Sequence, residues 1–315
     1  NSPNSHIHQW NAQIEQALDN HTSLTVAYVG TNMGNLATQF NANQTVLGGT
    51  TSWFPVGGAI NPNGVGTINA YEMVGTGSYN ALQTQLVRRL SSGLQINASY
   101  TWGHAIDDAS DVLANAPNGI LVGANGTPLL KYQRGNSNND QRNLFGAAAI
   151  YDLPFGRGKQ FGQNMPRALD YVVGGWQWNN VIELASGTPM DIQGAPNSPN
   201  GRPDYHGGCR TGVSWDVWIS CPKGAFTAPA GLVGNLPRNY FPGPGTHSWD
   251  TSLVKSIHVT EREQTEFRAQ VYNLTNTPQF QIPDTNYNNG DFGQLLNPRL
   301  SPTNRELELA LRLSF

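Results

Sequence analysis

The last ten residues alternate strictly between apolar and polar side chains. One face carries Leu307, Leu309, Leu311, Leu313 and Phe315. The other face carries Glu306, Glu308, Ala310, Arg312 and Ser314. A period of two is the side-chain geometry of a β-strand, and about ten residues is the length of a tilted strand that crosses a bilayer. The segment predicts a β-strand that either crosses a membrane in a barrel or closes a soluble β-sandwich.

The composition favours a wet, loop-rich protein. Charged residues are 12% of the 315 residues, compared with about a quarter in ordinary soluble domains. Hydrophobic residues are 38%, and the chain has 35 Gly and 20 Pro. Such a balance suits an outer-membrane barrel with a polar interior, and also a secreted all-β binding protein. The net charge of -3 is too small to indicate a nucleic-acid partner or an anionic membrane surface.

Targeting signals give little further guidance. No stretch approaches 18 consecutive apolar residues, so no transmembrane helix is predicted. The opening residues 1–4 lack a starting Met, a basic segment and an apolar segment, which a signal peptide requires. We therefore expect the chain to be a processed product or a fragment.

The alternation of the last strand recurs upstream. Residues 10–15 and 24–29 form a predicted hairpin around a turn at 19–21, and residues 79–102 form the clearest hairpin. The second arm of this hairpin has one apolar face, made of Leu94, Ile96, Ala98, Tyr100 and Trp102. Its other face is wholly polar and uncharged, with Gln95, Asn97, Ser99 and Thr101. A face of this kind is expected to line water rather than to pack inside a sandwich.

Further strands complete the fold prediction. They are expected at 145–153, 176–184, 252–259 and 266–271, with a weaker strand near 68–74 and one short helical turn within 163–173. Short turns near residues 20, 92 and 261 alternate with long loops at 107–140 and 187–246. Short periplasmic turns and long extracellular loops are typical of outer-membrane barrels. The predicted fold is all-β, an antiparallel transmembrane β-barrel segment of about ten strands.

Aromatic side chains gather near the predicted strand ends. They are Trp10, Trp102, Tyr151, Trp176, Trp178 and Trp249. Girdles of Trp and Tyr mark the two membrane interfaces of a barrel. Ordinary core aromatics are the alternative interpretation.

The two cysteines predict a disulfide. Cys209 and Cys221 lie 12 positions apart in a loop rich in Gly and Pro. Such a pair in a charge-poor, loop-rich chain fits one disulfide in an oxidising compartment, and two unpaired thiols are the alternative. The spacing matches no common metal motif.

Few residues suggest chemistry. Asp107, Asp108 and Asp111 follow His104 and could bind Ca²⁺, although a solvated loop with turn-forming aspartates is the simpler interpretation. No other cofactor is expected. His6 and His8 share one strand face, where an exposed polar surface is favoured over a metal site. Because the chain has no G-x-S-x-G, H-E-x-x-H or P-loop motif, we do not expect an enzyme.

The last strands carry charges on their wet faces. These are Glu266, Arg268, Glu306, Glu308 and Arg312. Opposite charges on neighbouring strands can pair along the wall of a barrel. We favour a wall-stabilising ladder of such pairs over a substrate path.

Several segments together resemble the C-terminal part of Oar-like TonB-dependent receptors, the large outer-membrane barrels common in acidobacteria. No single motif decides the resemblance, but the order and spacing match along nearly the whole chain. The matching stretches are SYNALQ at 78–83, GLQ at 93–95, ASYTW at 98–102, AIDDAS at 105–110, YDLPFGRGK at 151–159, RN at 238–239, GPG at 243–245 and FRAQVYNLTN at 267–276.

The resemblance implies a barrel of the 22-stranded transporter type, of which about ten strands are roughly half. An open half-barrel would leave two strand edges in lipid. Residues 1–315 are therefore expected to be half of a longer polypeptide, to pair with a missing half, or to close into a smaller barrel. The family's plug, TonB box and carboxypeptidase-regulatory-like domain are not recognisable in residues 1–315, so TonB would act only through a missing region.

The implied function is binding and passage of a nutrient ligand in the outer membrane, with lipid as the surrounding partner. A non-transporting surface protein for assembly or adhesion is the alternative. Resembling proteins end on an aromatic residue that looks like the signal for outer-membrane assembly. On this basis Leu311, Leu313 and Phe315 are the candidate assembly signal.

Overall fold

The computed structural model describes residues 3–43, 68–110, 120–123, 127–196, 198, 200–231, 233–258, 264–296 and 304–315. Two sequence predictions lie outside these ranges. They are Asp111 as a calcium ligand and the turn around residue 261.

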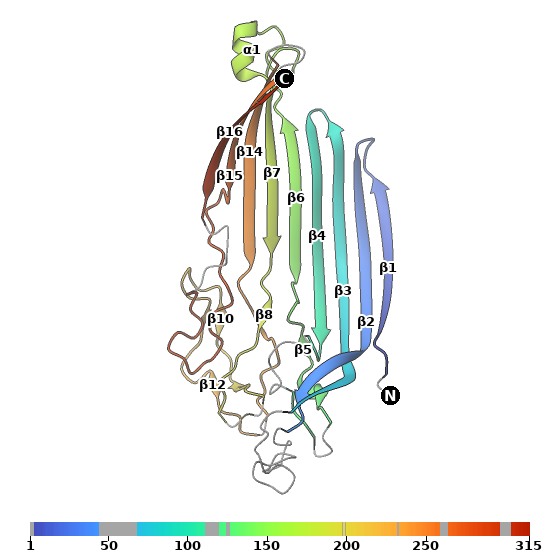
Figure 1. Ribbon diagram of the computed structural model, residues 1–315, viewed down its shortest axis with the longest axis vertical. Coiled ribbons are helices and arrows are strands. Elements are labelled where there is room, and N and C mark those ends of the chain that lie inside the picture. Colours follow the sequence, from blue (N-terminus) through green and yellow to red (C-terminus); the bar gives the residue numbers. More distant parts are fainter. Residues whose placement is uncertain are drawn as a thin grey trace.

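One antiparallel sheet of ten strands dominates the molecule, as predicted (Figure 1). The short β5 (Gly135–Asn136) pairs with the end of β4, and the nine long strands follow one another in chain order across the sheet. These strands are β1 (His6–Ala17), β2 (Thr22–Asn41), β3 (Asn69–Ser91), β4 (Leu94–Asp107), β6 (Asn143–Asp152), β7 (Trp176–Ala185), β14 (Thr246–His258), β15 (Gln264–Tyr272) and β16 (Glu306–Ser314). The weak strand expected near 68–74 is the beginning of β3, because the chain continues without a break into the 79–91 arm.

The strand register sorts side chains onto two faces. Leu82 lies opposite Tyr28 and Trp102, and Phe267 lies opposite Leu311. We define the apolar face by Trp10, Tyr28, Leu82, Trp102, Phe145, Leu184, Leu253, Phe267 and Leu311. The polar face carries Gln13, Gln83, Asn97, Asn179, Ser252, Gln270 and Glu308.

Much of the apolar face is left exposed by the described parts of the chain. The four leucines of β16 are between 64% and 67% exposed. Trp10, Trp102 and Trp178 are 47%, 56% and 42% exposed, so these three are not core aromatics. A large exposed apolar surface of this kind marks contact with a membrane or another protein.

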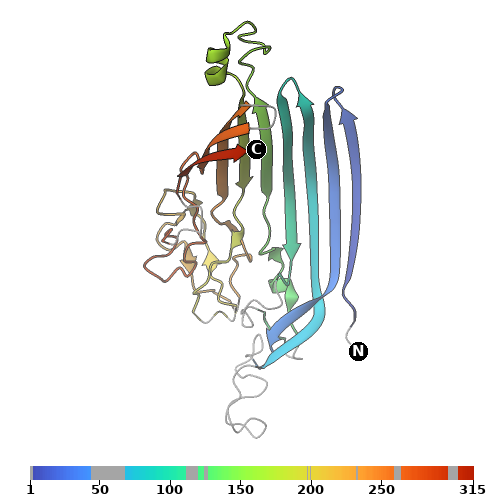
Figure 2. The same cartoon turned by 45° about the horizontal axis from the view of Figure 1, so that its top comes forward.

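Connections of different length lie at opposite ends of the sheet (Figure 2). The β1–β2 and β3–β4 turns lie at one end, together with α1 (Arg167–Val173) between β6 and β7. This end is called the turn end, and the C-terminus lies near it. The strands β2, β4, β7 and β15 run toward the other end, called the loop end, where the described part of the β7–β14 loop lies. The helix falls within the predicted 163–173 segment, but it makes the β6–β7 connection longer than a tight turn.

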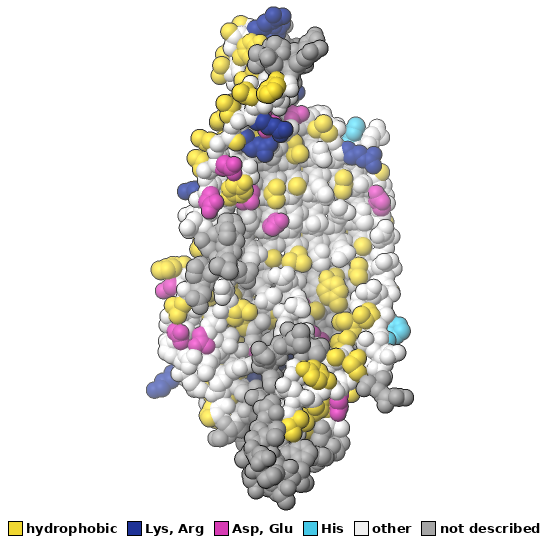
Figure 3. Space-filling view, in the orientation of Figure 1, with side chains coloured by type: hydrophobic (Ala, Val, Ile, Leu, Met, Phe, Trp, Pro, Cys, Tyr) yellow, Lys and Arg dark blue, Asp and Glu magenta, His cyan; other side chains and the backbone are white. Residues whose placement is uncertain are grey.

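Charged side chains are unevenly distributed over the surface. In Figure 3 the Lys and Arg side chains gather mainly toward the turn end, and large parts of the sheet between its two ends are uncharged. Among the described residues, no helix has the length and apolar character needed to cross a membrane.

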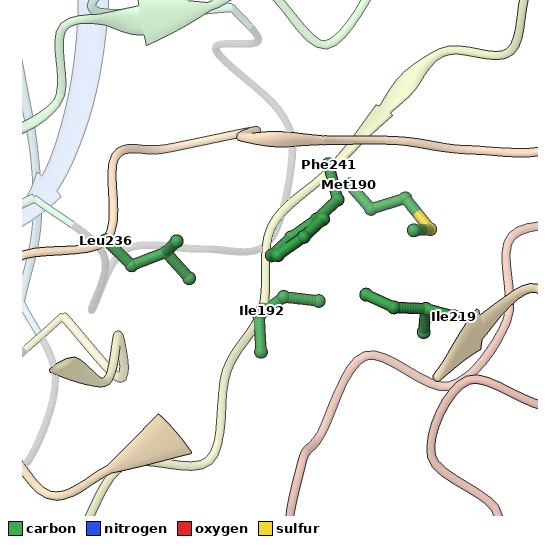
Figure 4. Packing of buried hydrophobic residues seen from close by; sticks show 5 residues of the cluster. All are labelled: Met190, Ile192, Ile219, Leu236 and Phe241. Carbon is green, nitrogen blue, oxygen red and sulfur yellow. The ribbon is translucent and has the colours of Figure 1, made fainter. Parts of the chain in front are cut away.

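The compact hydrophobic cluster lies in the long β7–β14 loop rather than under the sheet. Five buried side chains meet there, from Met190, Ile192, Ile219, Leu236 and Phe241 (Figure 4). The described part of this loop contains short strands that pair with one another as β8 with β13, β9 with β12 and β10 with β11. They are β8 (Pro189–Met190), β9 (Asp204–Tyr205), β10 (Arg210–Thr211), β11 (Ile219–Ser220), β12 (Phe226–Thr227) and β13 (Phe241–Pro242). The predicted disulfide between Cys209 and Cys221 is present and packs against the cluster.

Candidate ligand-binding site

A polar cavity of about 200 Å³ lies at the loop end. It forms where the far part of β2, the end of β4, the segment after the 3-10 turn Leu130–Tyr132 and the β7–β14 loop converge. The lining side chains come from Gln39, Asp108, Ala109, Ser110, Ile120, Gln133, Asn138, Asp191, Gln193, Asn200, Arg202, Arg238 and Asn239. Eleven of these thirteen are polar or charged, so the cavity is suited to a ligand that forms hydrogen bonds.

A bulge in β2 positions one wall of the cavity. The pairing of β2 with β3 shifts register between Met33 and Leu36, and Asn35 adopts a φ of 53°. Asparagine tolerates this left-handed conformation better than most residues, because its short side chain forms local hydrogen bonds. Beyond the bulge, β2 and β3 bend away from the sheet toward the loops (Figure 1, Figure 2). Gln39 is thereby carried to the cavity.

An ion pair ties the long loop to the end of β4. Arg238 Nη2 donates to the backbone oxygen of Asp107 at 2.9 Å and to its carboxylate. Ser110 Oγ donates to the same carboxylate at 2.7 Å. Both charged side chains are nearly buried, with 12% and 9% exposed. The pair therefore fixes the wall of the cavity that Arg238 provides.

The neighbouring carboxylate of Asp108 is held by β3. It accepts hydrogen bonds from the backbone nitrogen and the hydroxyl of Thr76, both at 2.6 Å. Two of the three carboxylates predicted to bind calcium thus have protein partners. No group of three or more His, Cys, Asp or Glu side chains close enough to hold a metal ion occurs among the described residues.

A second buried cation lies across the cavity. Arg202 is 3% exposed and donates from Nη2 to the backbone oxygen of Tyr132 at 2.9 Å and to Gln133 Oε1 at 3.0 Å. Its Nε lies 3.9 Å from Asp191 Oδ2. Burial raises the pKa of the Asp191 carboxyl, and the attraction of Arg202 opposes this shift. Burial likewise lowers the pKa of the Arg202 guanidinium, which stays charged at neutral pH.

Four buried nitrogen atoms, in side chains of residues that line this cavity, have no hydrogen-bond acceptor. They are Gln133 Nε2, Asn200 Nδ2, Arg202 Nε and Arg238 Nε. Gln133 and Asn200 are 4% and 5% exposed. A buried donor without a partner costs about 1–3 kcal/mol. Because all four donors belong to residues around one cavity, a bound molecule with oxygen acceptors, toward which these side chains turn, would relieve the cost.

The family comparison decides what kind of molecule carries this site. Residues 1–308 match the family described as "Outer membrane beta barrel domain". The chain belongs to this outer-membrane β-barrel family. Its location is the outer membrane, and the family is one of membrane barrels rather than enzymes, as the sequence predicted. No curated protein matches the chain.

Solved structures of outer-membrane receptors and transporters resemble this barrel domain. The outer membrane transporter YddB from Escherichia coli has a TM-score of 0.50 at 10% identity, with 98% of this chain and 32% of that chain covered. The ferric-catecholate import receptor Fiu from K12 E. coli gives 0.45 at 13% identity, with coverage of 98% and 27%. The siderophore receptor PiuA from Acinetobacter baumannii gives 0.46 at 12% identity, with 97% and 28%. The chain thus spans less than a third of each structure.

Family membership orients the barrel domain. Outer-membrane barrels place short turns in the periplasm and long loops outside, with the apolar face toward lipid. The polar cavity therefore lies at the extracellular end. A larger cavity of about 530 Å³ is lined by Tyr100, Phe145, Leu184, Trp218 and Pro242 among others. Tyr100, Phe145 and Leu184 lie on the apolar face of the sheet, so this second cavity is separate from the polar face.

The charges predicted on the last strands lie elsewhere in the barrel domain. Glu266 and Arg268 line a separate cavity with Asp152 and Lys159. Arg268 Nη2 lies 3.0 Å from Glu266 Oε1 on the same strand. Glu266 lies opposite Arg312, Gln270 opposite Glu308 and Tyr272 opposite Glu306 in the register of β15 and β16. The structure does not bring these five charges to the extracellular cavity.

Sequence reasoning missed most of the cavity. Gln133, Asp191, Asn200 and Arg202 come from irregular segments and match no motif. Asp108 is predicted from the sequence as a calcium ligand and as part of the family resemblance, and Arg238 only as part of that resemblance. One sequence signal would have selected Asp191, Arg202 and Arg238. It is the presence of isolated arginines and aspartates within the long loops.

Proposed function

We propose that the chain is the C-terminal portion of a TonB-dependent receptor-like barrel, of the Oar-like type, that binds a nutrient ligand and lets it cross the outer membrane. The observation that carries this proposal is the extracellular cavity with four unpartnered buried donors. A site of this kind at the mouth of a membrane barrel is suited to capture a solute from outside the cell.

The rest of the receptor would come from outside residues 1–315. Among the described residues β1 and β16 each have one neighbour only and form the two edges of the sheet. An unpaired strand edge in lipid is costly. We propose that further barrel strands cover both edges, and that a plug region, through which TonB would act, lies in the same missing part.

Two further roles belong to this proposal. Glu266, Arg268, Glu306, Glu308 and Arg312 would stabilise the inner wall as a set of charges on the polar face. Leu311, Leu313 and Phe315 would form the assembly signal, and Phe315 is fully exposed. Deletion of Phe315 should reduce the amount of protein inserted in the outer membrane, measured by surface protease protection. Unchanged insertion would contradict this role.

Uptake into cells tests the transport function. The natural gene product is expressed in a Gram-negative host that lacks its own porins, and labelled oligosaccharides, peptides and iron chelates are offered. We expect uptake of one of these classes that stops when the proton-motive force is dissipated. A protein that reaches the surface and takes up none of them would overturn transport and favour the surface-protein alternative.

A further inference from the structure

We propose that the extracellular cavity binds a neutral polyhydroxyl unit, such as one sugar residue of a larger ligand. This inference rests on the proposed function for its role in capture, and it names the ligand class of the same site. It follows from the way in which the charged groups and the unpartnered donors are combined around the cavity.

The charges of the cavity are already balanced. Arg238 is paired with Asp107, and Arg202 faces Asp191. Asp108 and Asp191 both line the cavity. An anion placed here would meet two carboxylates and no cation without a counter-charge, and close like charges disfavour binding. A cation would meet the four unpartnered N–H donors, so a neutral ligand fits best.

The hydrogen-bonding groups of the wall are mixed. Gln133, Asn200, Arg202 and Arg238 present donors without acceptors, whereas the Asp191 carboxylate supplies an acceptor. A hydroxyl group both donates and accepts, so adjacent hydroxyls satisfy both kinds of wall group at once. Amide carbonyls of a peptide would satisfy donors too, but a peptide also brings side chains.

The size and lining of the cavity disfavour apolar side chains. Ala109 and Ile120 are the only apolar residues among those that line it in the described structure. Its volume of about 200 Å³ is smaller than that of sites for drug-sized ligands, about 300–1,000 Å³. The cavity therefore accommodates one small polar unit rather than an extended apolar group.

Two conservative substitutions remove single donors without breaking the bonds that the structure shows. Gln133→Glu keeps the oxygen that accepts from Arg202 and removes the unpartnered Nε2 donor. Asn200→Asp keeps the oxygen that accepts from Ser198 and from the backbone of Arg202, and removes the Nδ2 donor. Asn97→Asp is the matched control, because it makes the same change on the polar face and keeps the acceptor for Gln85.

Binding is measured by saturation-transfer NMR and titration calorimetry with the purified natural gene product, the same protein as in the uptake test, in outer-membrane lipid vesicles. The probes are glucose, galactose and N-acetylglucosamine, with citrate, inorganic phosphate and triglycine as comparisons. We expect at least one sugar to bind saturably and the comparisons not to bind. Q133E and N200D should each weaken sugar binding about 3- to 10-fold, the effect of one neutral hydrogen bond. N97D should bind as the parent does.

Three results would overturn the proposal: no sugar binds the parent chain, citrate, phosphate or triglycine binds in place of sugar, or both variants bind sugar as tightly as the parent. If a variant fails to fold, the comparison of probes on the parent still decides the ligand class. Sugar binding without any uptake would sustain this inference and overturn transport. Uptake of an iron chelate or a peptide without sugar binding would do the reverse.

Discussion

Arg238 and Asp107, 131 positions apart in the chain, form a nearly buried ion pair that joins the β7–β14 loop to the end of β4. The same arginine also donates to the backbone oxygen of Asp107 at 2.9 Å. The pair connects the rigid sheet to the irregular loop that supplies Asp191, Asn200 and Arg202. The geometry of the cavity consequently depends on it.

Replacing one member of this pair should be costly. Arg238→Met leaves the Asp107 carboxylate buried without its counter-charge, and we expect a loss of about 3–5 kcal/mol in the free energy of unfolding. The measurement is urea-induced unfolding in detergent. The double variant with Asp107→Leu should lose clearly less than the sum of the two single variants. Additive losses would show that the two side chains do not stabilise each other.

A glycine on the apolar face makes room for a tryptophan. Gly30 lies opposite Trp10 in the register of β1 and β2, and a Cβ at Gly30 would lie 2.3 Å from the indole ring. Gly30→Ala should displace the ring and cost about 1–3 kcal/mol, the usual range for an overpacked site. Unfolding in urea and the tryptophan emission spectrum measure the two effects.

Gly146→Ala is the control for this substitution. It also lies within a strand, but a Cβ there would meet nothing nearer than Ser99 Oγ at 3.6 Å. We expect it to change stability by less than Gly30→Ala and to leave the emission spectrum unchanged. Equal effects of the two substitutions would mean that the Trp10 contact is not the cause.

The pH dependence of stability should reveal Asp191. Because burial raises its pKa in the folded state, the folded protein binds more protons than the unfolded chain above the ordinary aspartate pKa of about 3.9. The contribution of Asp191 is therefore fully present below that pH and is lost as the pH rises through the folded-state pKa. Relative to Asp191→Asn, the parent protein should become less stable as the pH rises above about 4. A difference in unfolding free energy between the two proteins that stays constant as the pH rises from about 4 would contradict the raised pKa.

The sequence predicted the sheet well because period-two patterning is a local property. The alternation around Tyr100 and Leu309 follows from strand geometry alone, and so do the hairpins at 19–21 and 92–93. The sequence predicts a separate, weak strand before Gly75, whereas the structure has one continuous strand, β3, through this position. The cavity was beyond reach, since Gln133, Arg202 and Arg238 meet only through the folding of irregular loops, which carry no periodicity. The bulge at Asn35, which carries Gln39 to the cavity, likewise cannot be predicted from the alternation of apolar and polar residues.

The most direct test of the central claim compares two adjacent residues of β16 in lipid vesicles. Leu309→Cys and Glu308→Cys are labelled with an environment-sensitive fluorophore and exposed to brominated lipids and to iodide in water. A lipid-facing apolar surface and a water-lined polar surface predict that bromine quenches only the label at 309 and iodide only the label at 308. Equal quenching of both labels by either agent would contradict the assignment of this chain as the wall of an outer-membrane barrel.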